Sequence, residues 1–134
     1  MTRVVVPVRY PLTKHSRRTL EAAIDIAAER EAALTVLHVD LYQNSKRIDR
    51  ADLKRATERT FGHVPNARYV VRRGFLVEES ILDEVAAEDA DVVVIGNKQA
   101  GRWRRMLRKI VDEPDIDGYL RRHLDCEVVT VEAE

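Results

Sequence analysis

The densest group of chemically capable side chains in this sequence is a run of cations in its C-terminal third. Five positive side chains fall within eight residues, beside Trp103: Arg102, Arg104, Arg105, Arg108 and Lys109. Cations next to an aromatic ring can bind phosphates or nucleic-acid bases. The apolar residues of this stretch recur at helical spacing, which favours instead a solvated helix face whose cations pair with carboxylates of this chain or of a partner. Nucleic-acid binding is the weaker of the two interpretations.

Side chains that could act as nucleophiles or metal ligands are scattered along the chain. The four histidines, at positions 15, 38, 63 and 123, are not paired at metal-ligand spacing, and there is one cysteine. Ser16 lacks the glycine-flanked turn of a nucleophilic serine and is better placed to cap a helix. Cys126 precedes an apolar run and is expected to be a small buried residue. We therefore predict neither metal binding nor enzyme activity.

Composition limits the remaining classes of function. The 134 residues suit a single domain over 1–134, and 45% of them are hydrophobic, enough for a packed core. Because 23 basic and 23 acidic residues cancel, no overall field draws the chain to nucleic acid or to a membrane. No apolar run approaches the roughly 20 residues of a membrane span or resembles a signal-peptide core. These features predict a cytoplasmic protein.

The apolar residues follow two periods. Short runs rich in valine and isoleucine predict buried strands at residues 3–8, 34–39, 67–71, 91–96 and 127–131. Apolar residues at steps of three and four predict helices at 16–31, 46–61 and 77–86, and two short helices within 103–124. Alternating strands and helices require right-handed crossovers, with helices on both faces of the sheet. The expected fold is a five-stranded, parallel, doubly wound α/β sheet of the Rossmann-like type.

In such a sheet, ligands bind beyond the carboxyl ends of the strands, where the strand order reverses. The loops that follow the first, second and fourth strands are expected to begin at Arg9, Leu41 and Asn97. Gly96 and Gly101 would let a ligand approach backbone amides, although this spacing also suits an ordinary turn. The candidate nucleotide crevice comprises six residues: Pro7, Arg9, Val39, Gly96, Lys98 and Gly101.

Several segments together resemble the universal stress protein family. The resembling segments cover nearly the whole chain and lie at residues 4–8, 15–22, 37–39, 74–96 and 120–131. The first of these is the valine-rich opening strand, and the last is the final helix and strand, joined by a turn that contains Cys126. This resemblance implies stress tolerance or regulation by protein association as the broad role.

The ATP-binding signature of that family is largely absent. ATP-binding members carry a glycine, two residues, a glycine, nine residues, and a glycine followed by serine or threonine. Gly96 matches the first position, but Gln99 and Lys109 stand at the next two, and a gapped alternative at Gly118 is followed by tyrosine. Arg9 stands where many members have an aspartate, which replaces an acceptor with a cationic donor. The resemblance therefore implies the branch without the nucleotide signature.

Two functions follow from this resemblance. The first is a homodimer that acts by protein association and does not bind ATP by the usual motif. An exposed apolar edge strand tends to aggregate unless another chain pairs with it. The expected interface is therefore the last strand, through Val128, Val129, Thr130 and Val131. The alternative is a sensor of ATP, another adenine nucleotide or another phosphorylated ligand, held by the cations Arg9, Lys98 and Arg102 at the strand carboxyl ends.

Overall fold

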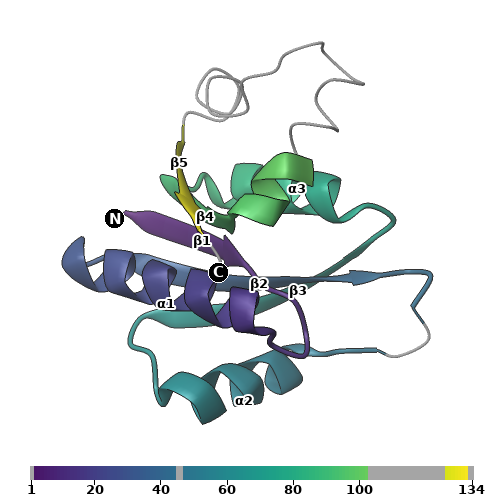
Figure 1. The fold of residues 1–134 in the computed structure, drawn as a ribbon, viewed down its shortest axis with the longest axis horizontal. Helices are drawn as coiled ribbons and strands as arrows, with labels where there is room; N and C mark the ends of the chain where they lie inside the picture. Colours follow the sequence, from purple (N-terminus) through teal and green to yellow (C-terminus); the bar gives the residue numbers. More distant parts are fainter. Residues whose placement is uncertain (1, 45–46, 103–125, 133–134) are drawn as a thin grey trace.

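A computed structural model describes residues 2–44, 47–102 and 126–132, and these form one sheet of five parallel strands (Figure 1). The strands are β1 (Arg3–Pro7), β2 (Ala33–Leu41), β3 (Ala67–Gly74), β4 (Val92–Gly96) and β5 (Glu127–Val131). Their order is β3-β2-β1-β4-β5, so the chain winds from β1 to one edge, returns to the centre and reaches the other edge. The predicted fold class is confirmed.

Helices cover both faces of this sheet. α1 (Lys14–Glu29) and α2 (Arg50–Phe61) lie on one face, and α3 (Val77–Glu88) lies on the other (Figure 1). Residues 97–102, directly after β4, are also helical. Among the described helices, none has both the length and the apolar character needed to cross a lipid bilayer.

The core consists of two layers because successive residues of a strand point to opposite faces. Val4 and Val6 of β1 belong with Leu20 of α1 to one buried layer, and Val5 belongs with Ile81 of α3 to the other. All five side chains are fully buried, and each contributes about 1.5–3 kcal/mol through the hydrophobic effect. Burial on both faces explains why the strand segments are continuously apolar rather than alternating.

Two helices begin at other residues than the sequence predicts. The prediction that Ser16 caps the first helix is wrong: Thr13 is the cap, and its Oγ1 accepts a hydrogen bond of 3.1 Å from the backbone N–H of Ser16. α2 begins at Arg50 rather than at residue 46, because Asp49 and Asp52 form a reciprocal capping box there. In both cases a side chain satisfies helix N–H groups that have no partner within the helix.

The strand and loop boundaries also differ from the prediction. β2 and β3 extend past their predicted ends, in a continuous register from Leu34–Ala67 to Leu41–Gly74. The added residues are mostly polar, and backbone hydrogen bonds hold a strand whatever its side chains are. Leu41 is therefore the last residue of a strand, and the segment from Asn97 is a helix rather than a loop. The two short helices predicted within 103–124, and the basic face beyond Arg102, lie outside the described residues.

Candidate functional site

The strand order reverses between β1 and β4, which pair in the sheet although two strands and three helices separate them in sequence. The strand that follows β1, β2, lies on one side of this pair, and the strand that follows β4, β5, lies on the other side. Open α/β sheets bind ligands at such a reversal, beyond the carboxyl ends of the two strands. The segments 8–15 and 97–102 therefore bound the candidate crevice.

Lys98 and His15 meet at this crevice. The Nζ atom of Lys98 lies 3.4 Å from Nε2 of His15, so the helical segment after β4 contacts the first turn of α1. An ammonium group can only donate, so Nε2 is the acceptor in this contact. The Nδ1 atom of the same ring is buried and has no hydrogen-bond partner among the described residues. The pair brings a cation to the switch point, and no described carboxylate forms an ion pair with it.

The loop after β1 is held by contacts with β2 and α1. The Nδ1–H group of His38 donates to the carbonyl of Val8 over 3.0 Å, and the backbone N–H of Arg9 donates to Oγ of Ser16 over 3.1 Å. The ring of Tyr10 lies 6.1 Å from that of His38. These contacts fix the backbone of the loop, whereas the side chain of Arg9 is exposed and forms no ion pair with any described residue.

The other predicted crevice residues have mainly structural surroundings. Pro7 ends β1, and Val39, which is 8% exposed, belongs to the core layer beneath α3. Gly96 ends β4, where an added Cβ would lie 3.3 Å from Oγ1 of Thr19, so the missing side chain lets α1 approach the sheet closely. Gly101 lies within the helical segment rather than in a turn. Of the six predicted residues, Arg9 and Lys98 carry the charge that a ligand could use.

Among the described residues, the switch point offers the charged side chains of Arg9 and Lys98 rather than a loop of glycine residues. After Gly96 the chain enters a helix at once, and Gln99 in that helix donates from Nε2 to Glu78 over 3.2 Å. A loop that holds phosphate through its amides needs close backbone approach, whereas exposed cations bind an oxyanion by charge-assisted hydrogen bonds. The described residues contain no group of three or more histidine, cysteine, aspartate or glutamate side chains that could hold a metal ion.

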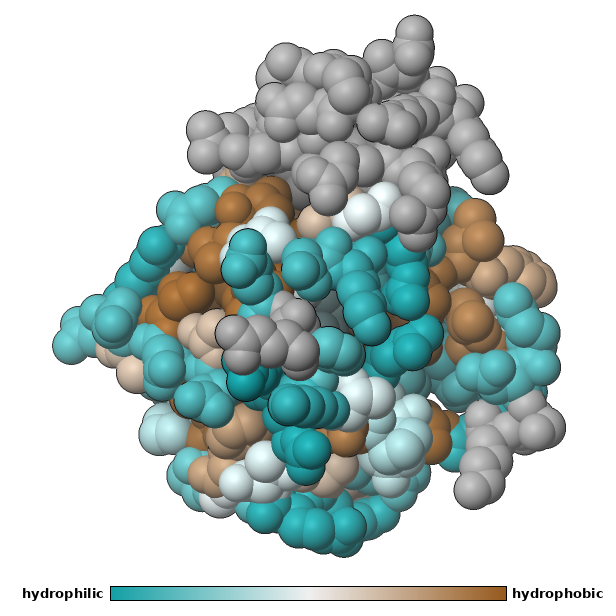
Figure 2. Space-filling view, in the orientation of Figure 1, coloured by the Kyte–Doolittle hydropathy of each residue, from teal (hydrophilic) through white to brown (hydrophobic). Residues whose placement is uncertain are grey.

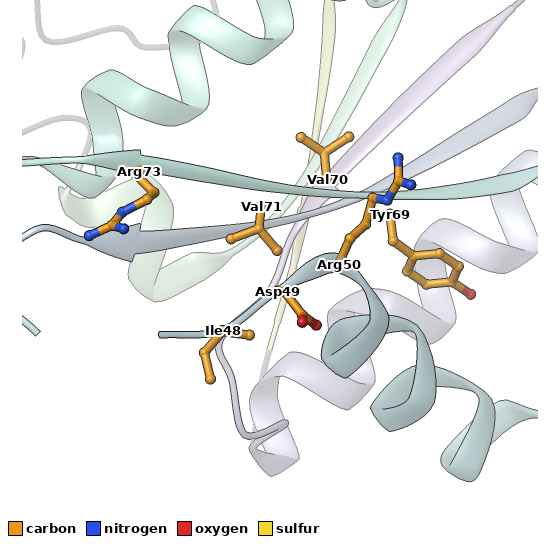
Figure 3. Close-up of a pocket in the computed structure, with 7 residues that line it drawn as sticks. All are labelled: Ile48, Asp49, Arg50, Tyr69, Val70, Val71 and Arg73. Carbon is orange, nitrogen blue, oxygen red and sulfur yellow. The ribbon is translucent and has the colours of Figure 1, made fainter. Parts of the chain in front are cut away.

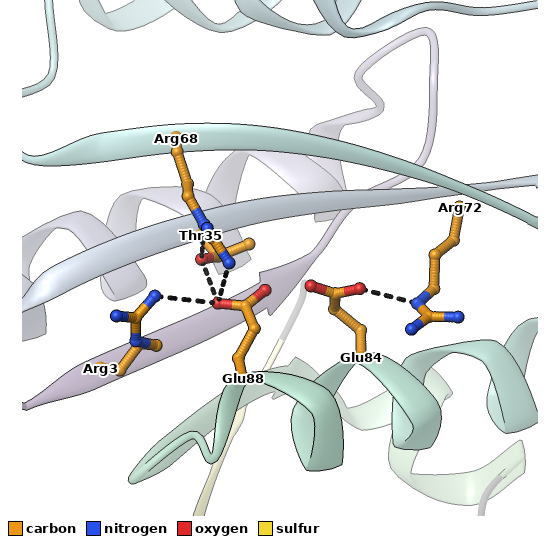
Figure 4. A network of polar contacts seen from close by, with 6 residues as sticks. All are labelled: Arg3, Thr35, Arg68, Arg72, Glu84 and Glu88. Carbon is orange, nitrogen blue, oxygen red and sulfur yellow. Dashed lines mark hydrogen bonds and ion pairs between the residues drawn. The ribbon is translucent and has the colours of Figure 1, made fainter.

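A second polar cluster lies on the α3 face of the sheet, and its Glu88 contacts Arg3 at the start of the central strand (Figure 4). The Oε1 atom of Glu88 accepts a hydrogen bond of 2.6 Å from Thr35 and lies 3.0 Å from Arg68 Nη2 and 3.7 Å from Arg3 Nη1. One turn earlier, Oε1 of Glu84 lies 2.7 Å from Nε of Arg72. These contacts join β1, β2 and β3 to α3, so the cluster serves the packing of the fold.

The pKa values of the two carboxyl groups of this cluster are shifted in opposite directions. Burial raises the pKa of Glu84, and a hydrogen bond to Glu88 raises it further, against the effect of Arg72. Burial also raises the pKa of Glu88, but hydrogen bonds from Glu84 and Thr35 and the positive charge of Arg68 outweigh it and leave that pKa lowered. Glu84 thus holds a proton to higher pH than Glu88, beside which it lies (Figure 4).

The sequence prediction missed this cluster and the contact of His15. A signal for the cluster is present, because Glu84 and Glu88 fall at helical steps from Ile81, on the face of α3 that the core requires. A carboxylate at such a position needs a buried partner. No comparable signal marks His15, because its partner Lys98 is 83 residues away.

A doubly wound parallel sheet whose strand order reverses between β1 and β4 defines the class: an open α/β domain of the Rossmann-like type. A family model, described as the Universal stress protein family, matches residues 1–132. The chain therefore belongs to the universal stress protein family, and the resemblance seen in its sequence segments is confirmed.

Solved structures of that family share the fold of this chain. A universal stress protein in complex with cAMP has 18% identity and a TM-score of 0.64, with 99% of this chain and 98% of that chain covered. UspA from Lactobacillus plantarum has 20% identity and a TM-score of 0.64, with 97% of each chain covered. The universal stress protein from Archaeoglobus fulgidus in complex with dAMP has 19% identity and a TM-score of 0.51, with 97% of each covered. No curated protein sequence matches this chain significantly.

Proposed function

We propose that this chain is a non-enzymatic, cytoplasmic member of the universal stress protein family that acts by protein association, and that two copies pair through β5. The observation that carries the proposal is the position of β5 at an edge of the sheet. The backbone N–H of Glu127 donates to Asp91, so the alternation of a parallel ladder directs the N–H and C=O groups of Val128 and Thr130 away from β4.

The side chains of β5 support the same proposal. Val128, Val129 and Val131 are only partly buried, and Thr130 is exposed. An apolar edge strand with unused backbone groups invites aggregation unless another chain covers it, and a symmetric pairing of two copies does so. An ion pair of 2.9 Å joins Glu127 at the start of β5 to Arg30, the residue that follows α1.

Thr130→Pro tests this interface, because proline removes an outward N–H group and no bond of the ladder to β4. We expect sedimentation velocity to show a dimer of the unaltered protein and at least a tenfold weaker association of the variant, about 1.4 kcal/mol. Val71→Pro, at the opposite edge of the sheet, is the matched control. A wild-type protein that stays monomeric, or a Thr130→Pro variant that dimerises as well as wild type, contradicts the proposal.

Binding of a phosphorylated ligand is the second candidate function, and the contact between Lys98 and His15 favours it. Arg9 and Arg102 are further cations that could join this site, with ATP or another adenine nucleotide as ligand. The relatives whose structures contain cAMP and dAMP give the ligand class to test first.

Native mass spectrometry of the purified protein separates the two functions: a copurified nucleotide supports the sensor, and an empty dimer supports association alone. A ligand at one hundred times its Kd should stabilise the fold by about 2.7 kcal/mol in a salt-sensitive manner. Lys98→Ala should abolish that shift, whereas Lys54→Ala, an exposed lysine on α2, should retain it. The absence of any shift with millimolar nucleotide or polyphosphate contradicts the sensor.

A further inference from the structure

β3 is the second edge of the sheet, opposite β5. The backbone N–H group of Leu34 in β2 donates to the carbonyl of Asn66 over 2.9 Å. The N–H group of Tyr42, directly after β2, donates to the carbonyl of Gly74 over 3.0 Å. Because the register between them is continuous, even-numbered residues of β3 bond to β2 and odd-numbered residues direct their backbone groups outward. The outward residues are Ala67, Tyr69, Val71 and Arg73. None of the described residues hydrogen-bonds to these outward groups, so β3 offers the backbone of a further ladder.

A cleft follows this edge, between β3 and the first turns of α2 (Figure 3). It consists of two adjoining hollows of about 430 and 540 Å³, which share Asp49, Arg50 and Tyr69. Figure 3 shows the side chain of Arg50 extending from the start of α2 towards β3. An added strand would therefore lie beside β3 with α2 flanking one of its faces.

The lining of the cleft is strongly cationic. Its cations are Arg50, Lys54, Arg68 and Arg73, and the one acid among the lining residues, Asp49, uses its carboxylate to cap α2. Arg68 pairs with Glu88, but Arg50, Lys54 and Arg73 form no ion pair with any described residue. The guanidinium of Arg73 lies over the ring of Tyr42, 5.0 Å from its centroid, which leaves its charge without a carboxylate partner in the described part of the chain. Arg50 occupies the first turn of α2, where the helix dipole disfavours a cation, so its charge does not serve the stability of that helix.

From the outward backbone groups and this charge, we propose that β3 binds an extended acidic peptide segment of a partner protein, which adds a sixth strand to the sheet. The peptide backbone pairs with residues 67–73, and its acidic side chains face Arg50, Lys54 and Arg73. A second copy of β3 is a poor occupant, because like charges would lie opposite one another. Cations also deter apolar and basic strands from an exposed edge, so the same residues select for an acidic one.

The backbone pattern also distinguishes a peptide from a nucleic acid. The outward edge alternates N–H donors with C=O acceptors, which is the pattern of another peptide backbone. Phosphates carry only acceptors and would leave the carbonyl groups unpaired. A single-stranded DNA oligonucleotide is therefore the comparison probe for the experiment.

The test uses the full chain and a fluorescein-labelled peptide of eight residues, the length of β3, that alternates glutamate and valine. We expect saturable fluorescence anisotropy that weakens as salt rises, and no binding of the same peptide with lysine in place of glutamate. Hydrogen exchange followed by NMR should show new protection at the amides of Tyr69, Val71 and Arg73. The amides that already bond to β2 should be unaffected.

Two kinds of variant locate the site. Val71→Pro removes one outward N–H group and should weaken peptide binding at least tenfold, while Thr130→Pro at the β5 edge should not. If Val71→Pro does not fold, the double variant Arg50→Glu/Arg73→Glu, which reverses two charges of the cleft, tests the site instead. We expect this variant to bind the peptide roughly tenfold more weakly without a lower melting temperature. Arg17→Glu, an exposed reversal on α1, is the charge control and should bind like wild type.

Several results overturn the proposal. The first is that the lysine peptide binds as tightly as the acidic peptide. The second is that the acidic peptide binds without new protection at the odd-numbered amides of β3. The third is that the acidic peptide does not bind even at millimolar concentration. Tighter binding of the DNA oligonucleotide than of the peptide, or self-association that Val71→Pro abolishes, assigns this edge to another occupant and equally overturns it. Because the β5 variants test a separate edge, failure here leaves the proposed dimer unaffected.

Discussion

The two ends of the parallel sheet use their charges differently. At the Glu88 end, Arg3 and Arg68 pair with a carboxylate that α3 carries into the protein. At the carboxyl ends of β1 and β4, Arg9 and Lys98 form no ion pair with any described residue, and the contact of Lys98 is with the ring of His15. The cations at the Glu88 end are thus paired with a buried carboxylate, and those at the other end have no carboxylate partner among the described residues.

This difference shows that residue type alone does not indicate function. An arginine that is matched by a buried carboxylate contributes to the fold, because breaking the pair leaves an uncompensated group in a region of low dielectric constant. A cation without such a partner contributes little to stability and remains available to a ligand or another chain. Substitutions at the two ends should therefore affect different measurements.

The largest expected effect is on stability, from Glu88→Ala. The side chain of Glu88 is 3% exposed and receives contacts from Thr35, Arg68 and Arg3, so its removal leaves a small cavity and unpaired donors. We expect a loss of about 2 kcal/mol in the free energy of unfolding, measured by urea denaturation with an unchanged m-value. Asp83→Ala, which removes an exposed carboxylate from the same helix, should cost less than about 0.5 kcal/mol. Equal costs for the two variants would mean that the network does not hold α3 to the sheet.

A smaller effect, on pH dependence, should follow from Glu84→Gln. Because the pKa of Glu84 is raised in the folded state, its contribution to stability is complete below the ordinary value of about 4.3 and is lost as pH rises through the folded pKa. Glutamine imitates the protonated acid, so the variant should match wild type in acid and become the more stable protein near neutral pH. Urea denaturation at a series of pH values measures this crossover, with Glu79→Gln as the exposed control.

The contribution of Glu88 to stability depends on pH in the opposite direction. Its pKa is lowered in the folded state, so its stabilising contribution is present above the ordinary glutamate value and is lost as pH falls towards the folded pKa. Replacing Glu88 should therefore flatten the acid side of the stability profile, whereas replacing Glu84 flattens the side nearer to neutrality. A shift of both variants in the same direction would contradict the assignment of the proton to Glu84.

The smallest expected effect on stability is that of Lys98→Ala at the carboxyl ends of β1 and β4. Its side chain has no ion pair among the described residues, so the free energy of unfolding should change by less than about 0.5 kcal/mol. A loss near that of Glu88→Ala would show that the contact with His15 is structural, and the contrast between the two ends would then fail. Thermal unfolding of both variants under one condition makes this comparison.

Much of the architecture could be predicted from local patterns. The runs around Val5, Leu37 and Val93 are buried on both faces, and such runs occur in parallel strands whatever surrounds them. The boundaries were less predictable, because Thr13 and Asp49 cap their helices through side-chain geometry that many serines and aspartates could offer. For the site, Arg9 and Lys98 could be placed at strand ends, but the proximity of His15 to Lys98 could not.

The order of hydrophobic segments by itself determined the alternation of strands and helices and the membership of the universal stress protein family, because both depend on patterns within short windows of sequence. Only the tertiary structure decided which charges are matched and which edges are open. Arg3, Arg68 and Glu88 meet across 85 residues of chain because three strands and a helix pack together, and β3 and β5 become edges only once the strand order is set. Coulomb and hydrogen-bond energies depend on distance in space, which the spacing of residues along a chain does not specify.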